Sequence, residues 1–98
     1  MKSETIQTLH PQKGKTNNEI SLVKYIFIKE ALIKILSECA LTHTELMEEL
    51  FSRIKNDFDG GVQWYGQTVK LDLEARKIII RTNDKPQKYT LNTTNFYN

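Results

Sequence analysis

Residues 68–81 read TVKLDLEARKIIIR, and two different periodicities meet within this stretch. Up to Arg76 the apolar residues recur at helical steps, since Val69 and Leu73 fall on one face of a helix. Three isoleucines then follow in a row, and successive β-branched side chains favour a strand. The stretch therefore predicts a helix that ends near Arg76, a tight turn at Lys77 and a strand.

This helix is the third of the chain, and we expect it over residues 62–76. A helical wheel gives it an apolar arc of more than half the circumference, made of Val62, Trp64, Tyr65, Gly66, Thr68, Val69, Leu71, Leu73 and Ala75. The remaining side chains form a ridge that we expect to be exposed, made of Gln63, Gln67, Lys70, Glu74 and Lys77. The wheel thus predicts a helix packed on most sides, with one polar stripe facing solvent.

Asp72 stands apart because its angle on the wheel falls inside the apolar arc. A carboxylate in such a place needs a partner, and the candidates are Arg76, four residues on, and Arg53 in the preceding helix. We interpret Asp72 as half of a structural ion pair rather than as a catalytic acid.

Two further helices are expected before this one. The apolar residues of SLVKYIFIKEALIKILSEC recur at helical spacing, which predicts a first helix over residues 21–39 with Ser21 as its N-cap. In LTHTEL, Thr42 and Glu45 have the spacing of a capping box, so a second helix should run over residues 43–56. Two glycines then separate it from the third helix.

The first helix is expected to be buried on more than one side, with Val23 and Phe27 in its apolar stripe. Cys39, the only cysteine, belongs to the same segment and is interpreted as a small buried hydrophobe. A single cysteine allows no intrachain disulfide, and a reducing cytoplasm is the compartment that fits best.

The two ends of the chain differ from its middle. Residues 1–20 are mostly polar and predict a loose arm with at most one short edge strand over residues 5–9. Lys13 and Lys15 of this arm could contact phosphate, although a solvated basic loop is the preferred interpretation.

At the other end, a second strand is expected in QKYTL after the turn TNDKP, so residues 78–91 should form a hairpin. Residues 92–98 have no period and are expected to be a tail, in which Phe96 and Tyr97 either dock on the body or trail.

Composition places the chain among ordinary soluble domains. Its 98 residues, 39% apolar and 27% charged, leave room for one α+β domain over residues 21–91. The formal net charge of +2 is only mildly basic, so an anionic partner must be met by a local patch. The N-terminal residues lack the apolar region of a signal peptide, and no stretch has the roughly 18 apolar residues of a membrane span. We therefore expect a cytoplasmic protein without a membrane partner.

No constellation of residues favours an enzyme. His10 and His43 lack a nucleophile or a ligand set at a recognisable spacing. Asp57, Asp59 and Gly60 begin like a calcium loop, but the required glutamate and the other oxygen ligands do not follow. The sequence accordingly predicts no catalytic residue, no metal and no cofactor.

The order of helix, capped helix, helix and hairpin is that of a winged helix-turn-helix. The stretch LDLEARKIIIR resembles the end of the recognition helix in regulators of the MarR, PadR and GntR types. The run WYGQTVKLDLEARKIIIR, with KPQ after it and TLHPQKGKT before it, is similar to a small uncharacterised bacterial family of about this whole length, assigned to the winged-helix fold. Such sequences usually have glycine where this chain has Lys77.

The resemblance implies duplex DNA binding by a regulator of transcription. In winged-helix proteins that bind DNA, the third helix enters the major groove and the hairpin wing lies along the backbone or minor groove. By that analogy the DNA-binding residues are Gln63, Gln67, Thr68 and Lys70 on the third helix, and Arg81, Lys85 and Lys88 on the wing.

A winged helix can instead serve as a protein-interaction module, and this alternative stays open. In that case the polar ridge, or Trp64 with Leu71, would meet another protein, and an exposed apolar patch on the third helix would favour it. Many winged-helix regulators are dimers, so the resemblance also implies a weak homodimer. Because the sequence shows no long dimerisation helix, such a dimer would use the first helix, the arm or the tail.

Overall fold

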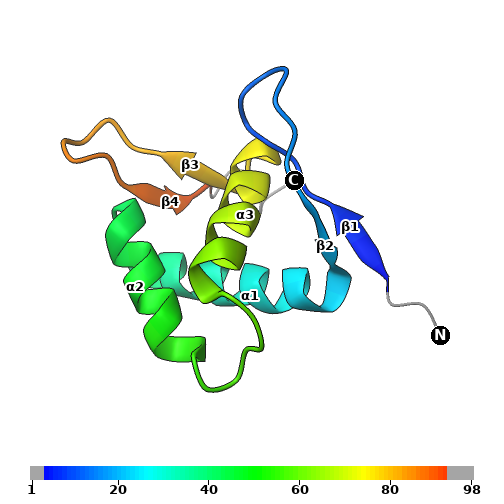
Figure 1. The fold of residues 1–98 in the computed structure, drawn as a ribbon. Helices are drawn as coiled ribbons and strands as arrows, with labels where there is room; N and C mark the ends of the chain where they lie inside the picture. The colour runs from blue at the N-terminus through cyan, green and yellow to red at the C-terminus, as the bar shows by residue number, and fades with distance from the viewer. Residues whose placement is uncertain (1–3, 93–98) are drawn as a thin grey trace.

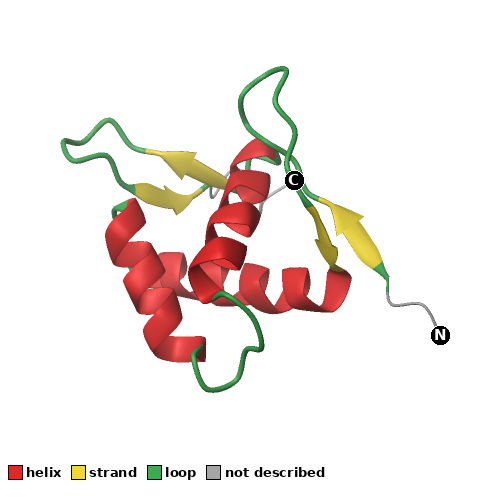
Figure 2. Cartoon of the chain, viewed as in Figure 1, coloured by secondary structure: helices red, strands yellow, loops and turns green. Residues whose placement is uncertain are grey.

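The computed structural model describes residues 4–92 and has an α+β fold. Within this range it contains three helices and two antiparallel strand pairs, which Figure 1 and Figure 2 show. The elements in chain order are β1 (Thr5–Gln7), β2 (Glu19–Ser21), α1 (Leu22–Glu38), α2 (His43–Ile54), α3 (Val62–Ala75), β3 (Ile79–Arg81) and β4 (Tyr89–Leu91). The three expected helices and the C-terminal hairpin are confirmed, with ends within two residues of the predicted ones.

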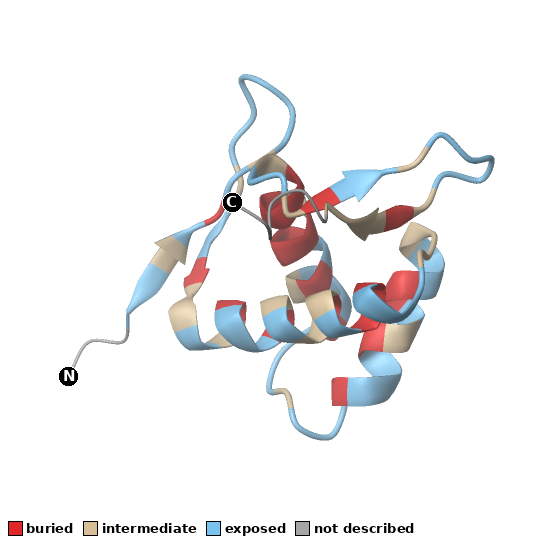
Figure 3. Cartoon of the chain, turned by 180° about the vertical axis from the view of Figure 1, so that it is seen from behind, coloured by how far each residue is buried: buried red, intermediate tan, exposed pale blue. Residues whose placement is uncertain are grey.

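Helix α3 lies at the centre of this arrangement. It packs across α1 and against α2, while β1–β2 and β3–β4 extend to different sides of it (Figure 1). The fully buried side chains come from all three helices and include Leu32, Leu46, Leu50 and Leu73. Figure 3 shows this burial concentrated where the helices face one another. Because so many segments meet α3, the surface it leaves free is small.

The helix starts follow the signals in the sequence. Ser21 caps α1, since its side chain accepts a hydrogen bond from the Lys24 backbone N–H at 3.4 Å. At α2 the Glu45 N–H donates to Thr42 Oγ1 at 3.2 Å, and the Thr42 N–H donates to Glu45 Oε1 at 3.0 Å. The predicted capping box is therefore present, and it satisfies two backbone donors at once.

The corner between α3 and β3 is made by Lys77, which adopts the left-handed conformation with φ 66°. The Ile78 N–H donates to the Leu73 carbonyl at 2.9 Å, and the Lys77 N–H donates to the Glu74 carbonyl at 3.1 Å. These two bonds are the Schellman pattern that closes a helix C-terminus. A lysine thus occupies a conformation that glycine adopts at lower cost.

The C-terminal hairpin, defined here as residues 79–91, is extended by one further backbone segment. Leu41 forms an antiparallel bridge with Tyr89, in which each N–H donates to the other carbonyl at 3.2 and 2.7 Å. The link between α1 and α2 is thereby tied to β4. The hairpin loop contains a cis peptide bond between Lys85 and Pro86.

The N-terminal segment differs from the loose arm that was predicted. It forms an N-terminal hairpin, residues 5–21, in which Ile6 pairs with Ile20 and the two strands run antiparallel. The expectation of at most one strand over residues 5–9 is therefore wrong. Each strand has only three residues, too few to produce a clear alternation in the sequence.

The buried side of α1 also differs from the prediction in the first part of the helix, whereas Leu32, Ile35 and Leu36 are buried as expected. Val23 is 78% exposed and Phe27 is 38% exposed, whereas Tyr25 is buried. Cys39 is exposed as well, because it follows the helix end and has an extended backbone. Tyr25 was not part of the predicted apolar stripe, and its hydroxyl is bonded to Asp72, which is 47 residues away. Phe96 and Tyr97 lie outside the described residues.

Candidate nucleic-acid interface

The predicted polar ridge of α3 is exposed in its first half and again at Lys77, but it is buried between these two parts. Gln63 and Gln67 are exposed, but Lys70 and Glu74 retain only 3% and 6% of their accessible surface. The expectation of one continuous exposed ridge is therefore wrong. Thr68 is buried as well, at 4%, so its side chain is covered rather than presented to a partner.

What α3 leaves free is a narrow strip that we call the open face. It is made of the exposed or half-exposed residues Gln63, Trp64, Gln67, Leu71 and Ala75. Trp64 is 50% exposed, although the wheel had placed it in the apolar arc, and its ring meets the Tyr65 ring edge-on with centroids 4.9 Å apart. The open face thus combines two amide side chains with one large aromatic ring.

Lys70 and Glu74 are buried because the C-terminal hairpin folds onto them. The Lys70 ammonium lies 3.2 Å from Glu74 Oε2 and 3.9 Å from the centroid of the Tyr89 ring. The other oxygen, Glu74 Oε1, accepts a hydrogen bond from Arg81 Nε at 2.7 Å. The Glu74 carboxylate therefore pairs with two cations, Lys70 and Arg81, and Lys70 also contacts the Tyr89 ring. These contacts join α3 to both strands of the hairpin.

This ion-pair group still carries one positive charge in excess. The hydrogen bond to Glu74 raises the pKa of Arg81, which stays charged at any physiological pH. The Arg81 side chain is 48% exposed. Its guanidinium has five N–H donors and uses Nε for Glu74, so donors remain for a further acceptor. Two predicted site residues belong to this group. Arg81 is accessible to a partner, whereas Lys70 is buried and holds the hairpin against α3.

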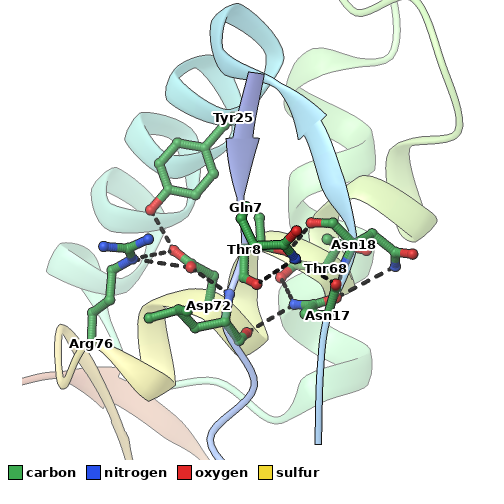
Figure 4. A network of polar contacts seen from close by, with 9 residues as sticks. Gln7, Thr8, Asn17, Asn18, Tyr25, Thr68, Asp72 and Arg76 are labelled. Carbon is green, nitrogen blue, oxygen red and sulfur yellow. Dashed lines mark hydrogen bonds and ion pairs between the residues drawn. The ribbon is translucent and has the colours of Figure 1, made fainter. Parts of the chain in front are cut away.

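On the opposite side of α3, Asp72 holds the N-terminal hairpin (Figure 4). The carboxylate is fully buried and accepts hydrogen bonds from the Tyr25 hydroxyl, from the Leu9 backbone N–H at 2.8 Å and from Arg76 Nε at 2.8 Å. Burial, and then the bond to Asp72, raises the pKa of Tyr25 above its ordinary value. Arg76 is thus the expected partner of Asp72, whereas Arg53 pairs elsewhere.

Asn17 provides a second connection between this hairpin and α3. Its amide group donates to the Leu9 carbonyl at 2.9 Å and to the Thr68 carbonyl at 3.0 Å (Figure 4). Thr8, which is 1% exposed, donates from its hydroxyl to the Asn18 carbonyl. The hairpin is therefore anchored by side chains that close it and bind it to α3 at the same time.

Of the three anchoring side chains, Asp72, Asn17 and Thr8, only Asp72 could be recognised from the sequence. The place of Asp72 in an apolar arc indicated a buried partner, but two of its partners, Leu9 and Tyr25, are separated from it by 63 and 47 residues. No periodicity connects positions so far apart.

The loop of the C-terminal hairpin presents the other predicted cations. Lys85 is exposed and Lys88 is half-exposed. Thr82 organises the loop, because its hydroxyl accepts from the Lys88 N–H at 3.1 Å while its own N–H donates to the Lys88 carbonyl at 2.8 Å. Lys85 is therefore held at the tip of a closed loop, next to Asp84.

The described part of the chain has two further properties that bear on function. None of the helices within residues 4–92 has the length and apolar character needed to cross a bilayer. In the same residues, no three side chains among the histidines, cysteines, aspartates and glutamates are grouped as metal ligands.

Comparison with known proteins places the chain in a family. Residues 5–89, from the first strand of the N-terminal hairpin to the start of β4, match the model of DUF6958, a family of unknown function, and the chain belongs to this family. No curated protein and no solved structure matches it. The resemblance to a small uncharacterised family is thus confirmed.

Proposed function

We propose that this member of the DUF6958 family is a small winged-helix DNA-binding protein, regulator-like, which contacts duplex DNA with the open face of α3 and with the C-terminal hairpin as a wing. Three helices followed by an antiparallel hairpin have the element order of a winged helix. In such proteins the third helix enters the major groove and the wing lies along the backbone.

The observation that carries the proposal is the exposure of Gln63 and Gln67 on a helix flanked by cations. They are four residues apart, so both amide groups project from the same side of α3. An amide side chain can accept and donate at once, which matches the N6 and N7 positions of adenine in the major groove. Two Gln side chains at this spacing can read neighbouring base pairs.

The wing supplies the contacts that carry no sequence information. Lys85 and Lys88 lie on its loop, and Arg81 keeps free guanidinium donors beside α3. Cations in such positions neutralise phosphates and fix the register of the protein on the duplex. Lys70 and Thr68 have a different part in this proposal, since they hold the wing and the N-terminal hairpin against α3 instead of contacting DNA.

Fluorescence anisotropy with random and selected duplexes tests the proposal. For about three phosphate contacts, the affinity should fall about 40-fold between 50 and 200 mM salt. The double variant Lys85→Ala/Lys88→Ala should weaken binding to all duplexes alike and flatten the salt slope, whereas Gln67→Ala should mainly reduce discrimination between sequences.

The matched control is Lys34→Ala/Lys55→Ala, which removes two exposed cations from α1 and from the C-terminal end of α2. This variant should bind as the unchanged protein does. Absence of binding at low salt, or equal decreases in affinity for the wing variant and the control, would contradict the proposal.

A second candidate function, protein interaction, is favoured by an aromatic surface that begins at Trp64 of the open face. Four rings follow one another from α1 to α3, with centroid separations of 5.8 Å for Phe27–Phe58, 5.2 Å for Phe58–Tyr65 and 4.9 Å for Tyr65–Trp64. Exposed aromatic side chains are typical of interface hot spots. If the protein binds no duplex DNA at low salt and Trp64→Ala abolishes its association with a protein partner, this second function is the correct one.

A further inference from the structure

A hollow of about 550 Å³ lies between the loop of the N-terminal hairpin, residues 8–18, and the C-terminal end of α3. Its wall includes His10, Lys15, Thr16 and Asn17, and Ala75 of α3 also lines it. Ala75 follows Leu71 by four residues, so the hollow continues the open face of α3 at its C-terminal end.

The polar groups that line the hollow include hydrogen-bond donors and one cation, Lys15. Residues 8–18 contain Lys13 and Lys15 and no acidic residue. The Gln12 N–H donates to His10 Nδ1 at 3.0 Å, which makes this nitrogen the acceptor and leaves the proton of the imidazole on Nε2. An ammonium group, an imidazole N–H and the Thr16 hydroxyl together suit an anion with several oxygen atoms.

The loop is held in this position by α3 itself. Asp72 accepts from the Leu9 N–H, and Asn17 bridges the Leu9 and Thr68 carbonyls, so both ends of the loop are attached to the same helix. Figure 1 shows this loop and the C-terminal hairpin diverging from the C-terminal end of α3. A preorganised basic loop binds an anion at lower entropic cost than a flexible one.

We infer that this hollow binds a phosphate group, with Lys15 as its charged partner and His10 as a donor, while Lys13, which does not line the hollow, adds positive charge to the same loop. Resting on the proposed function, the phosphate is a diester of duplex DNA, and the N-terminal hairpin is a second backbone-contacting element beside the wing. A free nucleotide offers the same chemistry, and competition between the two ligands identifies the source.

The first test measures DNA binding by anisotropy with variants of each loop. Lys13→Ala/Lys15→Ala should weaken binding to all duplexes and reduce the salt slope by about one for each phosphate that the variant no longer neutralises. Lys13→Arg/Lys15→Arg keeps both charges and should bind nearly as the unchanged protein does. All four lysines, in this loop and in the wing, are exposed or half-exposed, so thermal melts should coincide for every variant.

The outcomes separate this inference from the proposed function. If the Lys85→Ala/Lys88→Ala variant binds DNA more weakly and the Lys13→Ala/Lys15→Ala variant does not, the N-terminal hairpin makes no backbone contact and the assignment of the phosphate to duplex DNA is wrong, while the proposed function stands. If both variants bind more weakly, their effects on the free energy of binding should add, because they act on different phosphates.

The second test does not require DNA binding. Backbone amide resonances of residues 8–18 are followed by NMR during titration with inorganic phosphate and with adenosine monophosphate, against sodium chloride of equal ionic strength. Shifts that saturate and disappear in Lys15→Ala support the inference, and shifts no larger than those with chloride overturn it. Displacement of the nucleotide by duplex DNA identifies the diester as the ligand, whereas persistence of the nucleotide identifies a free phosphorylated compound.

Discussion

Asp72 is the residue on which two separate parts of the molecule depend. It is fully buried, and it accepts from α1 through Tyr25, from the N-terminal hairpin through Leu9 and from its own helix through Arg76. If the carboxylate were removed, the Tyr25 hydroxyl and the Leu9 N–H would lose their partner, and an unpaired buried donor costs more than the net gain of its hydrogen bond.

We therefore expect Asp72→Ala to lower the free energy of unfolding by about 3 kcal/mol, the lower end for a broken buried pair, because Arg76 is partly exposed and regains water. Urea melts measure the change. The control is Glu49→Ala, which removes a half-exposed partner of Arg53 and should hardly move the midpoint. Equal effects of the two substitutions would show that Asp72 does not hold the hairpin as described.

At the scale of elements, the local signals were sufficient for the helices and the C-terminal hairpin. Ser21, the capping box at Thr42 and the change of period after Arg76 each act within a few residues, and each was found where it was expected. The polar ridge was predicted less well. A wheel assigns one buried side to a helix, but α3 is covered on two flanks by hairpins, so Lys70 is buried despite its charge.

The corner after α3 gives a prediction about Lys77. A non-glycine residue in the left-handed region costs about 1 kcal/mol. Lys77→Gly removes this cost together with the side chain, whereas Lys77→Ala removes the side chain and keeps the cost. The glycine variant should therefore be more stable than the alanine variant by about 1 kcal/mol in thermal or urea melts. If the alanine variant is as stable as the glycine variant, Lys77 does not adopt a positive φ in solution.

At the scale of the whole molecule, the N-terminal hairpin and α3 form one structural unit. The hairpin was predicted to be a loose arm because its sequence is polar and its strands are short. Its attachment depends on contacts with residues more than 50 positions away, which local patterns do not report. The surface available for a partner, including the hollow at Lys15, consequently depends on how the hairpin packs on α3, and local sequence patterns do not predict this packing.

Hydrogen exchange of backbone amides tests this unity. The N–H groups of Thr8 and Leu9 are bonded to the Asn18 carbonyl and to Asp72, whereas Lys13 lies in the exposed loop. The Thr8 and Leu9 amides should exchange on the order of 100-fold more slowly than the Lys13 amide, relative to their intrinsic rates. Exchange of Leu9 at the rate of Lys13 would mean that the arm is loose in solution.

The hydrogen bond between Leu9 and Asp72 also constrains how the protein is made. These residues are 63 positions apart, and ribosomes add about 5 to 20 residues per second, so roughly 3 to 13 s pass between their synthesis. During this time the N-terminal hairpin and α1 exist without the helix that they surround. The buried face of α1 then has no partner, and closure of this long loop can begin only after α3 leaves the ribosome. Nascent chains are accordingly most exposed to aggregation and proteolysis just before α3 emerges.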